Sequence, residues 1–329
     1  MDAAEALLEI ASLLERERAS RYRAKAFRQA ADVVASLPAD VLDDPARLQA
    51  QKGIGASTFA VIRQAREGRV PDYLVELRGE VEPERTSALR AQLRGDLHSH
   101  TDWSDGTTPI DTMVAAARAL GHEYLAITDH SPRLKVARGL SAERLREQIP
   151  LVRAQSGDGL TVLAGIEVDI LEDGGLDQTP EMLDALDIVV ASVHSKLRMD
   201  PGTMTRRMLA AVADPHVNVL GHCTGRLVEG SRGTRPQSQF DARAVFAACA
   251  EYGVAVEINA RPERQDPPDD LIEIALDEGC LFSIDSDAHA PGQLSLLDYG
   301  AERAEAAGVP AERIVSTWGL ERLRAWARG

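Results

Sequence analysis

The sequence predicts an α/β fold in which a parallel barrel of about seven strand–helix units follows a small, wholly helical region. Two observations lead to this prediction. From about residue 94 onward, short apolar runs end in polar residues, and segments with helical spacing such as TPIDTMVAAARALG separate them. Near the start of the chain the apolar residues recur at helical spacing instead, as in Ala6, Leu7, Ile10, Leu13 and Leu14.

The polar residues that end the apolar runs recur at regular intervals. Each lies 27 to 37 residues after the one before it, which is the length of one strand, one helix and their connections. Functional sites of parallel barrels lie at the C-terminal ends of the strands, so we expect these side chains to meet there. They are His98, His130, Glu167, His194, His222, Asn259 and Asp287.

The first part of the chain carries two amphipathic helical patterns over residues 2–37 and a third that ends near Gly68. Pro38 and Pro45 are expected to bound a turn, and Pro71, Gly79 and Pro83 to mark a linker region. We therefore predict a helical domain over residues 1–80, a linker over 81–93 and a barrel domain over 94–329.

Composition excludes several classes of protein. The 329 residues are 44% hydrophobic and 27% charged, which is ordinary for a soluble globular protein, and no apolar stretch is long enough to cross a membrane. The acidic N-terminus is unlike a signal peptide, and three cysteines without a CxxC motif cannot form a disulfide framework. These features predict a cytoplasmic protein.

Charge is unevenly distributed. The net charge is −15, but the first 95 residues contain 15 basic and 15 acidic residues, so the whole excess lies in residues 96–329. An acidic region that also collects histidines is typical of a metal-binding domain, because bound cations offset part of the charge.

Six of the eight histidines fall at the predicted strand ends, and three carboxylates accompany them. Chance does not place six histidines at equivalent positions, whereas His122 and His216 fall outside the pattern. Alternate residues of a strand point the same way, so His98 and His100 can reach one ion, and imidazole with carboxylate suits Zn²⁺, Mn²⁺ or Fe²⁺. The predicted ligands are His98, His100, Asp105, His130, Glu167, His194, His222, Asp287 and His289.

The motifs HSHTDWSDG, TDHS, GIEVDI, VHS and SDAH resemble those of the polymerase-and-histidinol-phosphatase (PHP) family over roughly residues 94–329. The resemblance implies a distorted (β/α)7 barrel and a metal-dependent phosphoesterase with two or three divalent ions. It also implies three sets of ligands: His98, His100, Glu167 and Asp287 for one ion; Glu167, His194 and His222 for a second; Asp105, His130 and His289 for a third.

Longer segments are similar to the bacterial family X DNA polymerases. GIEVDILEDGGLD, GHCTGRL and EINARPERQD resemble the C-terminal PHP module of that family, and FRQAADVVASLP and KGIGAS resemble its N-terminal helix-hairpin-helix domain. Only a short linker separates the two parts here, so the sequence leaves no room for a polymerase core.

Two groups of residues are candidates for substrate contact. Lys52, Gly53 and Gly55 of the KGIG turn are predicted to bind the DNA backbone; the alternative is a tight turn between packed helices. Asn259 is expected to hydrogen-bond either the substrate or a metal ligand. Four basic residues close to the predicted ligands in the sequence are expected either to bind substrate phosphate or to form surface salt bridges. They are Lys196, Arg226, Arg261 and Arg264.

The favoured function is hydrolysis of phosphate esters at DNA ends, as a 3′-5′ exonuclease, 3′-phosphatase or abasic-site endonuclease. Glu167, His194 and Asp287 are the predicted catalytic residues, through the divalent ions that they would hold. A small-molecule phosphatase, for example one acting on histidinol phosphate, shares the barrel and its metals and suits the acidic charge. The third hypothesis, a non-catalytic DNA-binding adaptor, conflicts with nine intact ligands.

Overall fold

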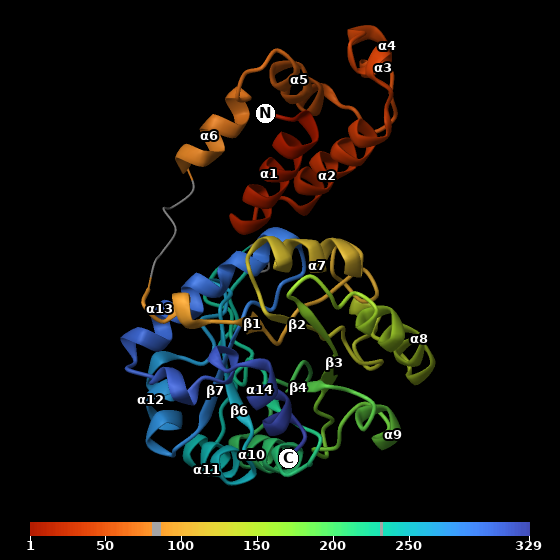
Figure 1. Ribbon diagram of the computed structural model, residues 1–329. Helices are drawn as coiled ribbons and strands as arrows, with labels where there is room; N and C mark the ends of the chain where they lie inside the picture. The colour runs from red at the N-terminus through yellow and green to blue at the C-terminus, as the bar shows by residue number, and fades with distance from the viewer. Residues whose placement is uncertain (81–86, 231–232) are drawn as a thin grey trace. The chain divides into compact units, whose positions relative to one another are not determined.

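The computed structural model describes residues 1–80, 87–230 and 233–329. The chain forms two compact units, residues 1–84 with 291–293 and residues 85–290 with 294–329 (Figure 1). The sequence-based limits of 1–80, 81–93 and 94–329 stay a prediction, and Pro83 and the rest of 81–86 lie outside the described residues. No helix within the described ranges has the length and apolar composition needed to span a bilayer.

The first unit is helical. Its first two helices pack through one apolar face each, with Leu7, Ile10 and Phe27 among the buried side chains. Asp2 begins the first helix, because its carboxylate accepts the backbone N–H groups of Ala4 and Glu5. The helices are α1 (Ala3–Arg16), α2 (Arg21–Ser36), α3 (Ala39–Leu42), α4 (Pro45–Gln49), α5 (Ala56–Arg66) and α6 (Asp72–Glu80).

Two segments of this unit are more helical than the sequence predicted. The turn expected between Pro38 and Pro45 contains the short helix α3, and the linker region expected from Pro71 contains α6. Proline fixes a backbone angle that suits the start of a helix, so Pro71 initiates α6 as readily as it would a loop. Leu74 and Leu77 then bury one face of that helix.

The second unit contains seven parallel strands in chain order, one in each apolar run that the sequence predicted. A parallel bridge between Ser99 and Ala288 joins the ends of the first and last strands, and the His100 N–H donates to the Ala288 carbonyl at 2.8 Å. The (β/α)7 barrel is therefore confirmed. The strands are β1 (Gly95–Asp96), β2 (Tyr124–Ile127), β3 (Thr161–Asp169), β4 (Ile188–Ser192), β5 (Val219–Leu220), β6 (Ala255–Asn259) and β7 (Leu281–Asp285).

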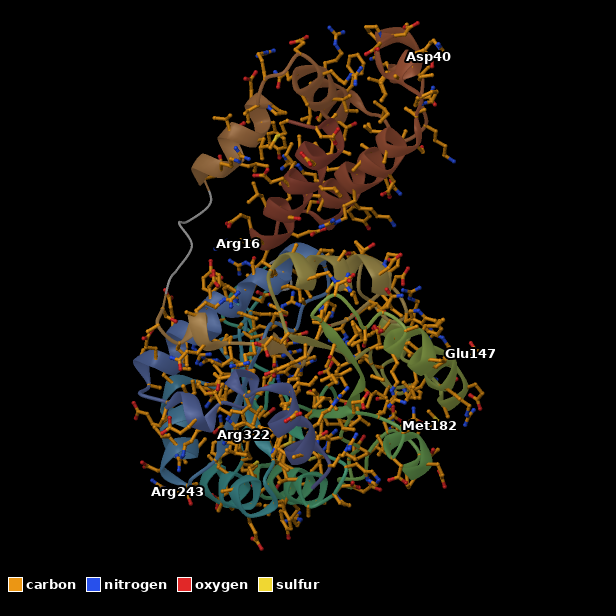
Figure 2. All side chains as sticks on the ribbon, viewed as in Figure 1. Arg16, Asp40, Glu147, Met182, Arg243 and Arg322 are labelled. Atoms are coloured by element: carbon orange, nitrogen blue, oxygen red, sulfur yellow. The ribbon has the colours of Figure 1, made fainter. Side chains whose placement is uncertain are left out.

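Helices surround the strands, as Figure 1 shows. Strand residues such as Leu125 and Ile127 pack outward against these helices, while Tyr124 belongs to a separate apolar core inside the barrel. Charged Glu147 and Arg243 lie on the outer helices, away from the strands (Figure 2). The helices are α7 (Ile110–Ala119), α8 (Ala142–Arg153), α9 (Pro180–Leu183), α10 (Pro201–Val212), α11 (Ala242–Tyr252), α12 (Asp269–Asp277), α13 (Leu297–Ala306) and α14 (Leu320–Ala327).

Strand β3 is the longest and changes partner midway. It pairs with β2 over Thr161–Ala164 and with β4 over Gly165–Asp169. At the change, a side chain on Gly165 would lie 2.7 Å from the Ile188 carbonyl oxygen and 2.8 Å from Cγ2 of Thr128. Only glycine lets the backbone approach this closely, and Gly165 thereby sets the position of Glu167, two residues further along the same face.

We expect Gly165→Ala to destabilise the protein by about 1–3 kcal/mol, because the added methyl group overpacks the junction of three strands. Thermal unfolding followed by circular dichroism measures the effect. Gly202→Ala in α10 is the matched control, since its nearest neighbour would be the Asp200 Oδ1 atom at 3.5 Å. Equal melting temperatures for the two variants would contradict the role given to Gly165.

Candidate metal centre

The inner face of β3 leads to the site. Side chains alternate along a strand, so Leu163 of the inner apolar core and Glu167 lie on the same face of β3. The interior is apolar up to this level and polar beyond it, toward the C-terminal strand ends. Glu167 is only 1% exposed, so its carboxylate is buried at the inner end of the barrel mouth.

Imidazoles surround the Glu167 carboxylate. Its Oε1 atom lies 2.9 Å from Nε2 of His222 and 3.1 Å from Nε2 of His194. Its Oε2 atom faces three further ring nitrogens, Nδ1 of His130 at 2.9 Å, Nε2 of His98 at 3.3 Å and Nε2 of His100 at 3.5 Å. The two oxygens of one carboxylate therefore face different sets of histidines.

Of the remaining three predicted ligands, Asp105 and His289 extend the group toward solvent, whereas Asp287 is buried. Oδ1 of Asp105 lies 3.4 Å from Nε2 of His130 and 3.3 Å from Nε2 of His289. Oδ1 of Asp287 lies 3.4 Å from Nε2 of His100. The structure brings together all nine residues that the sequence selected, and we call them the nine-residue cluster.

Three overlapping groups within this cluster have potential ligand atoms that all lie within 4.8 Å of one another. The most exposed group contains Asp105 and His289, whose side chains are 38% and 20% exposed. The other two are almost entirely buried. The groups are His100, Asp105, His130 and His289; His98, His100 and Asp287; and His130, Glu167 and His194.

The arrangement fits divalent metal ions. Ligand atoms bound at about 2.1 Å to one ion lie about 3 to 3.5 Å apart, which is the range of the separations above. Buried polar atoms normally have hydrogen-bond partners, yet both oxygens of Glu167 have none with good geometry. Unpartnered nitrogens accompany them in His98, His100, His130, His194 and His222.

Electrostatics keep the carboxylates ionised. Burial alone would raise the pKa of Glu167, but the imidazoles of His194 and His130 hold it well below its usual range. Burial opposes ionisation of Asp287 as well, and the guanidinium of Arg264 reverses the effect and lowers the pKa of that carboxyl. Both groups are therefore charged and able to bind a cation.

Carboxylates behind the ligands were missed by the sequence analysis. Glu257 is fully buried, its Oε1 lies 2.6 Å from Nδ1 of His98, and its Oε2 accepts the backbone N–H of His222 at 2.5 Å. Asp169 lies 3.3 Å from Nδ1 of His194. Such contacts orient metal-binding imidazoles. A charged residue at an inward position of the apolar run VAVEINA was the available signal for Glu257.

A third buried carboxylate, Asp129, holds the loop that carries Asp105. It accepts the backbone N–H of Thr101 at 2.8 Å and the hydroxyl of Thr101 at 2.6 Å. The hydroxyl of Ser104 and the amide of Gln148 each donate to it at 2.5 Å. Asp129 precedes His130 directly, so one side chain fixes both the end of β2 and the Asp105 loop.

The predicted phosphate contacts lie in different surroundings. Lys196 is exposed in the loop after β4. Arg264 is buried and its Nε donates to Asp287 at 3.0 Å, whereas Arg226 donates to backbone carbonyls of residues 264 and 265. Arg261 donates to the Asp287 carbonyl at 3.0 Å and lies 3.1 Å from Nδ1 of His289.

Asn259 hydrogen-bonds one of the ligands. Its side-chain amide donates to Asp287 Oδ2 and to Glu257 Oε2, each at 3.2 Å. The two histidines outside the pattern also lie outside the cluster. Burial lowers the pKa of His122 to about 4, and His216 contacts Asp184 and Asp214 at 3.1 and 2.7 Å.

The KGIG turn joins α4 to α5 in the helical unit. Gly53 has a φ of +97°, a conformation that favours glycine, and a side chain there would lie 3.3 Å from Cγ2 of Val33. Lys52 is exposed. Gly55 is the N-cap of α5, and its N–H donates to the Thr58 hydroxyl at 2.9 Å.

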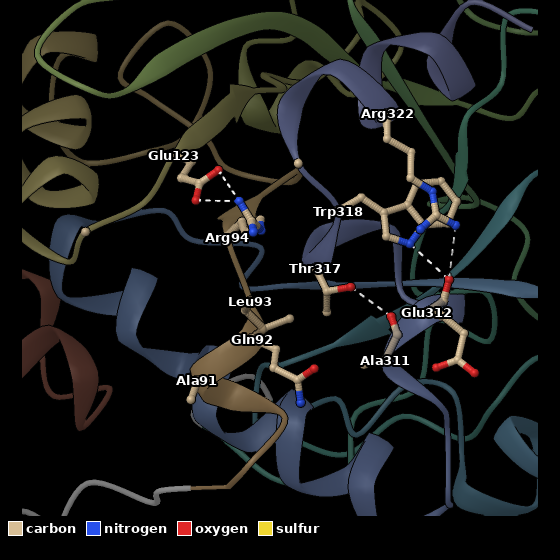
Figure 3. A pocket seen from close by; sticks show the side chains of 12 residues that line it. Ala91, Gln92, Leu93, Arg94, Glu123, Ala311, Glu312, Thr317, Trp318 and Arg322 are labelled. Carbon is tan, nitrogen blue, oxygen red and sulfur yellow. Dashed lines mark hydrogen bonds and ion pairs between the residues drawn. The ribbon is translucent and has the colours of Figure 1, made fainter.

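A separate hollow of about 750 Å³ is lined by residues that precede β1 and β2, such as Arg94 and Glu123, and by residues 311–322 near the end of the chain (Figure 3). Its charged and polar side chains largely satisfy one another. Arg94 pairs with Glu123 at 2.7 Å, the indole N–H of Trp318 donates to the Glu312 carbonyl, and Arg322 stacks on Trp318. The nine-residue cluster, with its unpartnered buried atoms, is therefore the candidate functional site.

Comparison with known proteins agrees with this geometry. The PHP domain model matches residues 96–261, and a helix-hairpin-helix domain model matches residues 1–69. The DNA polymerase/3′-5′ exonuclease PolX of Bacillus subtilis (strain 168) is 34% identical over 239 residues, which cover 72% of this chain but 41% of that protein. The chain thus spans less than half the length of this relative.

Two further similar proteins are matched over most of their own length. The probable phosphatase YcdX of Escherichia coli (strain K12) is 29% identical over 232 residues, which cover 67% of this chain and 89% of that protein. The histidinol phosphate phosphatase structure from Lactococcus lactis is 19% identical, with a TM-score of 0.46, over 65% of this chain and 94% of that one. The family match extends over half of the chain: this protein belongs to the PHP family of metal-dependent phosphoesterases and carries a helix-hairpin-helix domain before its PHP domain.

Proposed function

We propose that the protein hydrolyses phosphate esters at DNA ends, as a 3′-5′ exonuclease, 3′-phosphatase or abasic-site endonuclease, with two or three Zn²⁺ or Mn²⁺ ions held by the nine-residue cluster. Fe²⁺ suits the same ligands. The observation that carries this proposal is the convergence of all nine side chains at the barrel mouth, eight in the three groups and His222 through its contact with Glu167, in a chain that also has a helix-hairpin-helix domain. The likeness to a 3′-5′ exonuclease supports DNA as the substrate.

Divalent ions at such a site bind phosphoryl oxygens, lower the pKa of a bound water and stabilise the leaving oxygen. Glu167 is proposed to bridge two of them, because its Oε1 and Oε2 face different histidines. His194 would join it at one ion, and Asp287 would hold another with His98 and His100.

The chain's own groups would guide the substrate. Asp105, His194 and His289 are the solvent-facing members of the cluster, so they would meet an entering phosphate. Exposed Lys196 is proposed to contact phosphate oxygens, and so is Arg261, whose guanidinium lies 3.1 Å from Nδ1 of His289. Arg226 and Arg264 are engaged with the chain itself, which favours a role for them in fixing the site beside any contact with substrate.

A small-molecule phosphatase remains the second candidate, because the likeness to a probable phosphatase covers 89% of that protein and the acidic charge lies in the barrel domain. One assay separates the two: Mn²⁺-dependent release from a labelled oligonucleotide, measured beside phosphate release from histidinol phosphate. Activity on the oligonucleotide alone supports the DNA proposal. Activity on histidinol phosphate alone would contradict the DNA proposal and support the small-molecule phosphatase.

We predict that Glu167→Gln lowers activity by more than about 100-fold, since even the partners behind metal ligands contribute 10–100-fold. The variant keeps the volume of the side chain but loses the charge that binds two ions, so metal content should fall as well. Activity on a chromogenic phosphodiester and elemental analysis measure both effects.

His289→Ala should reduce activity less than Glu167→Gln does, because His289 belongs to only one of the three groups, the most exposed one. His216→Ala is the control outside the cluster and should leave metal content and activity unchanged. Full metal content in Glu167→Gln would show that the bridging assignment is wrong.

We also predict that Lys52→Glu raises KM for DNA about tenfold, because one phosphate contact becomes repulsive, and that the dependence of binding on salt becomes less steep. Hydrolysis of a chromogenic phosphodiester should be unaffected, since Lys52 is not part of the barrel. Steady-state kinetics on both substrates over a range of salt concentrations test this. An unchanged KM for DNA would show that the KGIG turn is not part of the DNA-binding surface.

A further inference from the structure

Residues 131–140 are the part of the connection between β2 and α8 that follows His130, and this part is called the β2–α8 loop below. It contains Arg133, Lys135 and Arg138 and no acidic residue, within a domain that carries the whole net charge of −15. All three basic residues are exposed. A concentration of positive charge beside the nine-residue cluster, in an otherwise acidic domain, favours an anionic ligand.

Two of these cations are available to a ligand. Across the described ranges, the side chains of Arg133 and Lys135 make no hydrogen bond or ion pair. Arg138 differs, since its guanidinium donates to the carbonyls of Asp102, at 2.9 Å, and Ser104. It therefore joins the β2–α8 loop to the segment that carries Asp105.

The base of the loop is fixed to the metal centre. The Ser131 N–H donates to the carbonyl of Glu167 at 3.0 Å, and the Leu140 N–H donates to the carbonyl of His130 at 2.7 Å. Asp177 accepts the hydroxyl of Ser131 at 2.9 Å and the backbone N–H of Arg133. The loop is thus held beside Glu167, and the exposed cations stand on a preorganised support rather than on a free segment.

Between the two available cations and Arg138 lies Val136, which is 93% exposed, the largest exposed fraction among the large hydrophobic residues described. A small phosphate ester needs no apolar contact outside the metal centre. Single-stranded nucleic acid presents both a charged backbone and the apolar faces of unpaired bases, so it matches an apolar tip flanked by cations.

The loop after β3 limits where such a strand can run. It carries exposed Glu172 and Asp173, which repel a phosphate backbone. Exposed positive charge lies on the β2–α8 loop and, beyond β3, on Lys196 and Arg198 in the loop after β4, where exposed Asp200 offsets part of it. A strand with its end at the metal centre is therefore best accommodated along the β2–α8 loop.

We propose that the β2–α8 loop binds the backbone of a single-stranded nucleic acid through Arg133 and Lys135 and contacts a base through Val136, so that the strand end lies at the nine-residue cluster. This inference rests on the proposed function and adds to it the form of the substrate.

The test uses the full chain with Arg133 and Lys135 both changed to Ala. On a short single-stranded oligonucleotide, kcat/KM should fall about tenfold at low salt, and the slope of log affinity against log salt should become less steep by about 1.4, or ~0.7 for each lost contact. Hydrolysis of a chromogenic phosphodiester should be unchanged. Val136→Asp should weaken action on the oligonucleotide in the same selective way.

Arg324→Ala with Arg328→Ala is the matched control, because it removes two exposed positive charges from α14 and its C-cap and should change neither activity. If the wild-type protein does not act on the oligonucleotide, the proposed function fails. If the wild type acts on it and the Arg133/Lys135 variant does so equally well, with the same salt dependence, the loop assignment is wrong and the proposed function stands. Equal loss on both substrates would also overturn the loop assignment.

Discussion

Burial of the Glu167 carboxylate is the constraint on which the barrel mouth depends. A buried carboxylate remains charged only with positive charge or strong donors beside it, and five imidazoles lie within 3.5 Å of this one. The imidazole nitrogens that face Glu167 and both carboxylate oxygens nevertheless lack hydrogen bonds of good geometry. Divalent cations would satisfy all of these atoms at once, so the site fits a metal centre better than a network of hydrogen bonds.

The barrel brings to Glu167 the groups that a buried carboxylate requires. Because the strands are parallel, their C-terminal ends bring side chains from distant parts of the sequence to one place. Gly165 lets β3 lie close to both neighbouring strands, and the buried carboxylates Glu257 and Asp129 hold the histidine rings and the Asp105 loop. The group that contains Asp105 and His289 is the one most open to solvent.

The sequence predicted the repeated strand–helix units and the nine clustered residues because both follow simple periodicity: a polar residue ends each buried run. It missed features that depend on three-dimensional neighbours. In the sequence Glu257 is one residue of a strand, and only the fold brings it to His98; the contact of Arg264, a predicted phosphate contact, with Asp287 likewise depends on the fold. The helix that follows Pro71 was missed because proline is compatible with both a linker and a helix start.

Anomalous X-ray diffraction at the zinc absorption edge, from crystals grown with Zn²⁺, tests the central claim most directly. The account predicts at least two anomalous peaks at the barrel mouth, one about 2.0–2.2 Å from each oxygen of Glu167, with the cluster's histidines completing the coordination. Peaks that avoid Glu167, or a mouth without any peak in which Glu167 is bonded only to protonated imidazoles, would contradict it.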